Sequence, residues 1–195
     1  MNGYTLGYIS LDESSIMLKI IHNDHVNMSL LLKLLRKNIR LLEADEKVDY
    51  RLIKAIITYL RQYADQYHHP MEDLIYDYYI KYRDVPDEII NRLSQEHQTI
   101  KKVTIEFDEL LDIILLDAIV PKDLFIVKLQ EFVDLQSSHL NYEEKEILPL
   151  IEKSLTADDW KNLEQQWQHK DYMDPLFGSN VTTQYSALAK HIKEE

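Results

Sequence analysis

The amino-acid sequence predicts an all-α protein, an up-down-up-down four-helix bundle with short additional C-terminal helices. Its 195 residues, 45% of them hydrophobic, suit a single domain over 1–195 with a sizeable core. Only 3 Gly and 5 Pro are present, so folds that need frequent tight turns are disfavoured. Long stretches rich in Leu, Ile, Glu, Lys and Gln repeat their apolar residues at helical spacing.

Four long helices are predicted at about 15–43, 49–81, 87–118 and 121–153. The charged stretch ADEKVD separates the first two, and RDVPDE separates the second from the third. Pro86 and Pro121 each fall in a first helical turn beside acidic residues, which is typical of a helix start. Because the connections are short, neighbouring helices are expected to run antiparallel in one bundle.

A C-terminal helical extension is predicted over about 156–195. Thr156 can cap a short helix that runs through Trp160 towards Trp167, with acidic residues in its first turn. The stretch DPLFGSN interrupts the helical pattern, and a last helix is expected near 182–193. Both short helices are expected to pack on the outside or over one end of the bundle.

Composition and charge exclude several classes of partner and cofactor. The formal net charge of −12 and the pI near 5.1 disfavour binding to nucleic acid or to anionic membranes. No cysteine is present, so any metal must take nitrogen and oxygen ligands, and disulfides and iron–sulfur clusters are excluded. No apolar run reaches the length of a membrane span, and the start MNGYTLGYISLDESS does not resemble a signal peptide. A cytoplasmic protein is therefore expected.

The first and third predicted helices each place a histidine on their apolar, inward side. In the first helix this side consists of Ile21, His25, Met28, Leu32, Leu35, Ile39 and Leu42. His22 falls on a more polar face, so the pattern selects His25 over His22. In the third helix, His97 shares its face with Ile100 and Phe107.

The second and fourth helices each add an inward carboxylate one turn after an inward histidine. His68 precedes Glu72, and His139 precedes Glu143, both at a spacing of i, i+4. This spacing lets an imidazole and a carboxylate point at the same spot from adjacent turns. Two such pairs on different helices can hold two metal ions, with the carboxylates bridging them.

A metal centre accounts for these six residues better than the alternatives. A single core histidine usually forms a hydrogen bond with a neighbouring group, but four of them with two buried glutamates change the balance. An unpaired buried carboxylate costs several kcal/mol, which a bound cation offsets. A salt-bridged network would need inward Lys or Arg, which the four inward sides hardly offer. Nitrogen and carboxylate ligands without a thiolate favour iron or manganese over structural zinc.

The stretches HNDHVNMSLLLKLL, YHHPMEDLIYDYY, SQEHQTI and SSHLNYEEKEILPLIE resemble the four helices of the hemerythrin-like, HHE cation-binding proteins. The tail SLTADDWKNLEQQW followed by DPLFG resembles the extension of bacterial members. This resemblance implies a centre of two non-haem iron ions with an oxo or hydroxo bridge. Its implied terminal ligands are His25, His68, His97 and His139, and its implied bridging carboxylates are Glu72 and Glu143.

One position departs from the pattern of the oxygen-carrying hemerythrins. Those proteins have five histidine ligands, two of them one turn apart on the third helix, whereas this chain has Lys101 one turn after His97. One iron would therefore have an extra open position, unless His69 or another group fills it. The helical neighbours of His69 place it on the outer face, but Pro70 can kink the helix and rotate it inward, so His69 is an additional candidate ligand.

The surface is the expected place of the remaining histidines, His22, His169 and His191. Tyr67 and Tyr142 adjoin ligand positions and are candidates to donate a hydrogen bond to a bound oxygen species or to carry an electron. The alternative for both is amphipathic packing at the edge of the bundle. Glu144 and Glu146 are expected to be solvated, with contact to a ligand histidine as the alternative.

The leading functional hypothesis is a non-haem di-iron protein that binds or reacts with dioxygen, peroxide or nitric oxide, with enzymatic turnover left open. A second is a regulatory iron or oxygen sensor, or an iron-handling protein without turnover, in which occupancy orders the bundle or its tail for a protein partner. A homodimer is compatible with both. The third is a metal-free bundle with a polar core. Metal analysis together with an optical spectrum under air and after reduction settles whether a metal is bound, and iron-dependent protease sensitivity of the tail without turnover of peroxide favours the sensor.

Overall fold

The computed structural model describes residues 15–168 and 172–194, apart from six side chains near the start of the third long helix, and all secondary structure within them is helical. The all-α class is thereby confirmed. The helices are α1 (Ile16–Glu43), α2 (Tyr50–Tyr63), η1 (Ala64–His68), α3 (His69–Tyr82), α4 (Asp87–Leu115), α5 (Lys122–Tyr142), η2 (Glu143–Ile147), α6 (Leu148–Ser154), α7 (Ala157–Gln166), η3 (Thr183–Tyr185) and α8 (Ser186–Glu194). No helix of these residues is long and apolar enough to cross a lipid bilayer.

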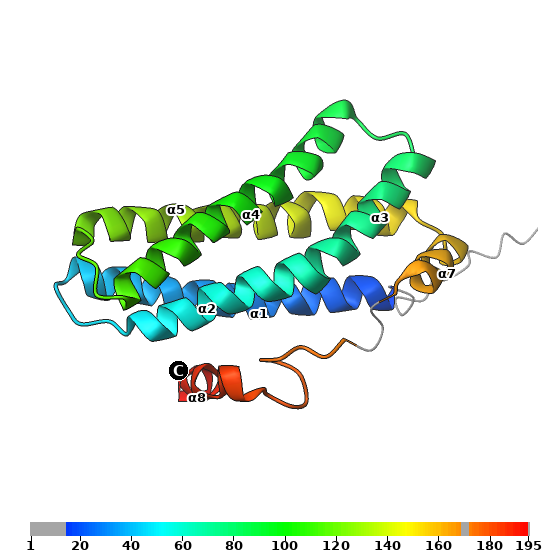
Figure 1. Cartoon of the computed structure of the whole chain (residues 1–195). Coiled ribbons are helices and arrows are strands. Elements are labelled where there is room, and N and C mark those ends of the chain that lie inside the picture. Colours follow the sequence, from blue (N-terminus) through cyan, green and yellow to red (C-terminus); the bar gives the residue numbers. More distant parts are fainter. Residues whose placement is uncertain (1–14, 169–171, 195) are drawn as a thin grey trace, which may run out of the picture.

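Four long helices lie side by side in Figure 1, with α1 packed against α5 and α2 packed against α4. The second long helix is α2, η1 and α3 in succession, and the fourth is α5, η2 and α6. The apolar side predicted for the first helix is confirmed, because its members are buried. Ile21 and Leu35 are fully buried, whereas Val26, on the polar face, is 56% exposed.

The second and fourth long helices are each interrupted by a π-helical turn, which the predicted continuous helices over 49–81 and 121–153 did not contain. Pro70 and Pro149 stand at the second position after these turns and have no backbone N–H to donate. The residue before each proline donates one position further back than in an α-helix: His69 N–H to Ala64 O, and Leu148 N–H to Glu143 O. Each turn therefore holds one extra residue, which shifts the inward side of the helix.

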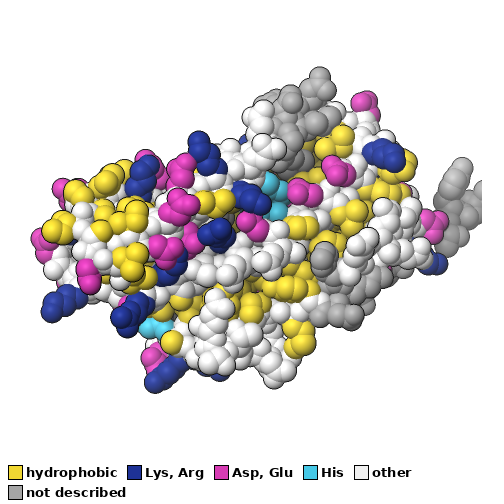
Figure 2. Space-filling model, viewed as in Figure 1, with side chains coloured by type: hydrophobic (Ala, Val, Ile, Leu, Met, Phe, Trp, Pro, Cys, Tyr) yellow, Lys and Arg dark blue, Asp and Glu magenta, His cyan; other side chains and the backbone are white. Residues whose placement is uncertain are grey.

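The C-terminal extension packs against the second long helix in two places (Figure 1). A capping box of Thr156 and Asp159 starts α7, and Asp159 also accepts hydrogen bonds from Tyr78 Oη at 2.7 Å and from Arg83 at 2.5 Å. These contacts fix α7 against α3, while α8 packs on α2. On the face shown in Figure 2, basic and acidic side chains are interspersed, so the excess negative charge forms no continuous patch there.

Candidate metal centre

The long helices bring all six predicted site residues into one buried cluster. Glu72 and Glu143 are fully buried, and the histidines are buried almost as completely; these are His25, His68, His97 and His139. His25 comes from α1, His97 from α4 and His139 from α5. The two glutamates come from the helices that the π turns interrupt, Glu72 after its turn and Glu143 at the start of its turn.

Glu72 lies between two groups of imidazoles, one formed by His25 and His68 and the other by His97 and His139. Its Oε1 is 3.1 Å from His25 Nε2 and 3.2 Å from His68 Nε2. Its other oxygen, Oε2, is 3.4 Å from His97 Nε2. One carboxylate therefore reaches both groups, as a bridging ligand would.

Glu143 lies between the same two groups from the opposite helix. Its Oε2 is 3.5 Å from His25 Nε2 and 3.2 Å from His139 Nε2. Its Oε1 is 3.6 Å from His97 Nε2 and accepts a 2.7 Å hydrogen bond from Tyr76 Oη. The two glutamates thus form the middle of the site, with imidazoles on either side.

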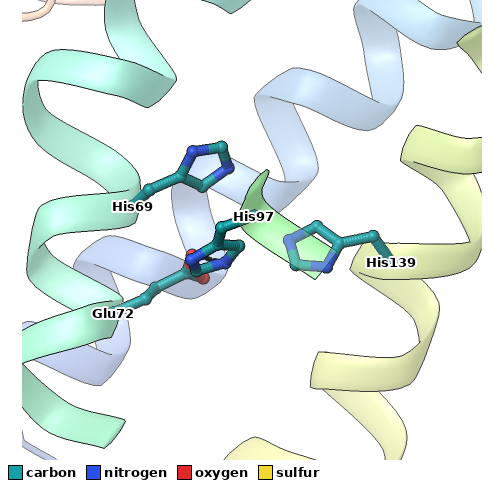
Figure 3. Close-up of side chains that lie close together, drawn as sticks. All are labelled: His69, Glu72, His97 and His139. Atoms are coloured by element: carbon teal, nitrogen blue, oxygen red, sulfur yellow. Dashed lines mark ion pairs between the residues drawn. The ribbon is translucent and has the colours of Figure 1, made fainter. Parts of the chain in front are cut away.

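His69 is buried inside this cluster, so the outer face expected for it is wrong. Its ring stacks on that of His97 with centroids 4.2 Å apart, and Figure 3 shows it beside Glu72, His97 and His139. The extra residue of η1 is the physical reason, because it lets the consecutive residues His68 and His69 both face inward. Lys101 instead lies 57% exposed and pairs with Asp65 at 3.6 Å.

These residues satisfy the geometry of two neighbouring cation sites. Possible ligand atoms of His25, His68 and Glu72 all lie within 4.8 Å of one another. The same limit holds for a second group, which consists of His69, Glu72, His97 and His139. Because Glu72 belongs to both groups, the two sites would share a ligand.

Each of the four predicted histidines also contacts a carboxylate through its outward nitrogen, Nδ1. The pairs are His25 with Glu144 at 2.7 Å, His68 with Asp24 at 3.2 Å, His97 with Asp73 at 2.8 Å, and His139 with Glu96 at 3.0 Å. A hydrogen bond of this kind fixes the tautomer and orientation of an imidazole, so that Nε2 points to the metal. We call these four acids the outer carboxylates.

The outer carboxylates form a closed cycle around the molecule. The acid of each long helix contacts the histidine of the next long helix along the chain. The acid of the fourth long helix contacts the histidine of the first. Sequence reasoning missed Asp24, Asp73 and Glu96, and it gave Glu144 a ligand contact only as an alternative. A signal was present, because each of the four acids directly adjoins a predicted site residue in the sequence.

The charges of the cluster shift the pKa values of its members. Burial opposes protonation of the histidines, but neighbouring carboxylates outweigh it and raise the pKa of His68 to about 9, of His25 to about 10 and of His97 to about 12. Burial likewise opposes ionisation of Glu72, yet His68 and its other imidazole neighbours hold its pKa well below the usual value. Burial and the nearby His97 keep the pKa of His69 well below its ordinary value.

The inward atoms of the site fit a metal ion. Four of them are buried and accept or donate no hydrogen bond within the described part of the chain: Glu72 Oε2, Glu143 Oε2, His97 Nε2 and His139 Nε2. Buried polar atoms are almost always hydrogen-bonded, and four exceptions that face one another need an explanation. A cation among them would use all four.

The remaining candidates lie away from the centre of the site. His22 is exposed at the surface, His191 is half-buried on α8, and His169 lies outside the described residues. Tyr67 packs among aromatic rings. The guanidinium of Arg92 lies over the ring of Tyr142, with its carbon 3.2 Å from the ring centroid. Tyr76, which the sequence did not single out, donates a hydrogen bond to Glu143 of the cluster.

Comparison with known proteins agrees with this site. Residues 16–151, which contain all the residues of the cluster, match the model of the hemerythrin HHE cation binding domain. No curated protein and no solved structure matches the chain. The match covers well over half of the sequence and all four long helices. The chain belongs to the hemerythrin HHE cation-binding family, and its buried His and Glu residues form groups that could hold a metal ion.

Proposed function

We propose that this protein is a four-helix-bundle, non-haem di-iron protein that binds or reacts with dioxygen, peroxide or nitric oxide. The observation that carries the proposal is the position of Glu72 and Glu143, each between two groups of inward imidazoles. Membership of the family supports iron, and so does a ligand set of nitrogen and oxygen without thiolate. A cytoplasmic location remains a prediction from the sequence.

In this proposal the two ions have different ligands. His25 and His68 would hold one ion, His97 and His139 would hold the other, and Glu72 and Glu143 would offer an oxygen to each. His69 completes the second set, where its stacking on His97 supports a role as a fifth histidine. The iron pair would supply reversible redox change and a binding position for the small oxidant.

The surrounding side chains hold this arrangement and control its protons. The outer carboxylates orient the four imidazoles, and Tyr76 Oη fixes one oxygen of Glu143 by a 2.7 Å hydrogen bond. Tyr76 is buried, and burial together with Glu143 raises its pKa well above the ordinary value. It therefore keeps its proton and is available as a donor beside the bridging carboxylate.

The sensing alternative also has an observation in its favour. Asp24 hydrogen-bonds both His68 and Tyr63, and Tyr63 contacts Tyr172 of the C-terminal extension at 5.9 Å between ring centroids. Metal occupancy could therefore change the order of the extension. Iron-dependent protease sensitivity of residues beyond 155, without consumption of peroxide, would favour sensing over reaction.

Metal analysis and spectroscopy test the leading proposal directly. Full-length protein reconstituted with ferrous iron is expected to retain about two ions per chain. Exposure to air or peroxide is expected to produce a near-ultraviolet absorption band that disappears on reduction. A ferrous form that responds to none of dioxygen, peroxide and nitric oxide would contradict the proposal.

The double substitution His68→Leu with Glu72→Leu tests whether the cluster is a metal site or a metal-free polar core. We expect it to abolish iron binding and to remove the rise in Tm that iron gives the native protein, because ligand binding stabilises the folded state. The control is His191→Leu, because His191 is a half-buried histidine on α8, outside the buried cluster. Unchanged iron content in the double variant would sink the ligand assignment.

His69→Ala tests the fifth histidine. If His69 binds iron, this variant opens a coordination position, so the ferric absorption spectrum shifts and azide binds more tightly than to the native protein. His97→Ala serves as the comparison, because it removes a histidine that an outer carboxylate supports and is expected to lower the iron content. An unchanged spectrum and azide affinity in His69→Ala would show that His69 only packs against His97.

Glu96→Gln tests the outer carboxylates. It keeps the size of the side chain but removes the charge that holds His139, and loss of such a partner is expected to weaken iron binding about 10- to 100-fold. Glu106→Gln is the matched control, because Glu106 is an exposed acid on the same helix and pairs with Lys102 at 3.9 Å instead of with a histidine of the cluster. Iron affinity is measured by competition with a chelator. Equal affinities of the two variants would exclude the supporting role.

The metal-free protein is expected to lose stability as the pH rises from about 6.5 through 9 to 10. The pKa values of His68 and His25 are raised from 6.5 to about 9 and about 10, so their contribution is complete below 6.5 and lost above the raised values. Each histidine changes the free energy of unfolding by about 1.4 kcal/mol per pH unit within that window.

Iron requires neutral imidazoles, so the iron-loaded protein should not show this loss of stability, and iron loading should release protons. Denaturant unfolding at pH 6–10 measures the effect; stability that rises with pH contradicts it.

A further inference from the structure

A cluster of aromatic side chains joins the second long helix to the C-terminal extension. It contains five tyrosines, one tryptophan and one phenylalanine, which are Tyr59, Tyr63, Tyr67, Trp167, Tyr172, Phe177 and Tyr185. The first three come from α2 and η1, and the other four come from the extension. The leading function proposed above uses none of them, and the sensing alternative uses only the contact between Tyr63 and Tyr172.

Hydrogen bonds join this cluster to a predicted iron ligand. Tyr63 Oη donates to Asp24 Oδ1 at 2.8 Å, and the other oxygen of Asp24 is 3.2 Å from His68 Nδ1. All three residues are buried. A continuous path of bonded groups therefore runs from the site to the first tyrosine.

Tyr63 is the point from which ring contacts extend outward. Its ring centroid is 5.4 Å from that of Tyr59, with the planes 12° apart, and 5.5 Å from that of Tyr67. Tyr67 in turn stacks on Tyr172, at 4.6 Å and 21°. Tyr172 is only partly buried, so the series of rings leads from the interior to the surface.

Tyr59 has a carboxylate ready to accept its phenol proton. Tyr59 Oη donates to Asp174 Oδ2 at 2.8 Å. An oxidised phenol is a far stronger acid than a phenol, so a tyrosine can be oxidised readily only where a base takes its proton. Asp174 supplies that base, and it comes from the extension.

Packing alone does not explain the choice of residue. Aromatic rings contribute stacking and burial whether or not they carry a hydroxyl. Five of the seven rings are nevertheless tyrosines, and the hydroxyls of Tyr59 and Tyr63 are buried against carboxylates. Phenylalanine would fill the same space without the need for these polar partners, but it cannot be oxidised under comparable conditions.

We propose that Tyr63, Tyr67 and Tyr172 carry one-electron oxidising equivalents between the metal centre and the surface. Tyr59 is the tyrosine on which the oxidising equivalent is held as a radical. The proposal rests on the reaction with an oxidant proposed above. Tyr59 gives one electron to the oxidised centre through Tyr63, and its proton moves to Asp174, which leaves a neutral phenoxyl radical and a carboxylic acid. A small one-electron reductant such as ascorbate then supplies an electron at Tyr172, and the proton returns from Asp174 to Tyr59.

A light-triggered experiment tests the path without any oxidant of the centre. The chain has no cysteine, and Met173 is 55% exposed beside Tyr172, so Met173→Cys offers a unique position for a ruthenium photosensitiser. A flash with an electron acceptor in solution then produces ruthenium(III) in the full-length protein loaded with ferrous iron. The measurement is the rate at which the iron becomes ferric, followed by its absorption.

Two variants interrupt the path and one serves as a control. Tyr63→Phe is expected to slow the oxidation of iron by about tenfold or more. The double substitution Tyr67→Phe with Tyr172→Phe is expected to do the same while leaving both hydrogen bonds of Asp24 intact. The control is Tyr78→Phe, because Tyr78 also donates to an aspartate, Asp159 at 2.7 Å, but lies outside the cluster.

The outcomes separate this proposal from the proposed function. Slower oxidation in both path variants, at unchanged iron content and with Tyr78→Phe like the labelled native chain, supports the path. Equal rates in all four proteins overturn it, and so does equal slowing by Tyr78→Phe. A ferrous centre that ignores dioxygen, peroxide and nitric oxide would overturn the proposed function but would leave these flash rates unaffected.

Discussion

Two fully buried carboxylates set the central constraint on this structure. Glu72 and Glu143 lie inside the molecule, where an uncompensated negative charge would cost several kcal/mol. In the metal-free protein, protonated imidazoles compensate them, as the raised pKa values of His25, His68 and His97 show. A cation bound at these atoms would replace those protons, so folding, proton uptake and the proposed metal binding depend on the same few atoms.

The outer carboxylates connect this constraint to the architecture. Each long helix provides an inward histidine and an acid that contacts the imidazole of the next long helix along the chain, and the acid of the fourth helix contacts the histidine of the first. The geometry of the site therefore depends on every neighbouring pair of helices being in register. Asp24 extends the connection further, because it reaches the aromatic cluster through Tyr63. The C-terminal extension is in this way joined to the centre through the hydrogen bonds of Asp24 and the ring contact between Tyr63 and Tyr172.

Much of the fold and most of the site could be predicted from the sequence. Helical periodicity located the long helices and separated the inward His25 from the exposed His22, because burial of one face repeats regularly along a helix. The periodic pattern could not reveal the two π turns, since one inserted residue changes the phase without changing the composition. That phase change explains why His69 was assigned to the outer face. Asp73 and Glu96 were missed for another reason: their roles depend on how neighbouring helices are placed, which one sequence does not specify.

The π turn before Pro70 has a consequence for how such sites can diversify. A regular helix presents only every third or fourth residue to one point, yet here two adjacent imidazoles do so. The π turn before Pro70 thus places His69 inside the cluster, next to His97 and in addition to His68. A chain that exchanged this proline, or lost one residue of the turn, would change the number of ligands available to one ion without altering any ligand residue. A change in backbone geometry can therefore alter the chemistry of the site, just as a change of side chain can.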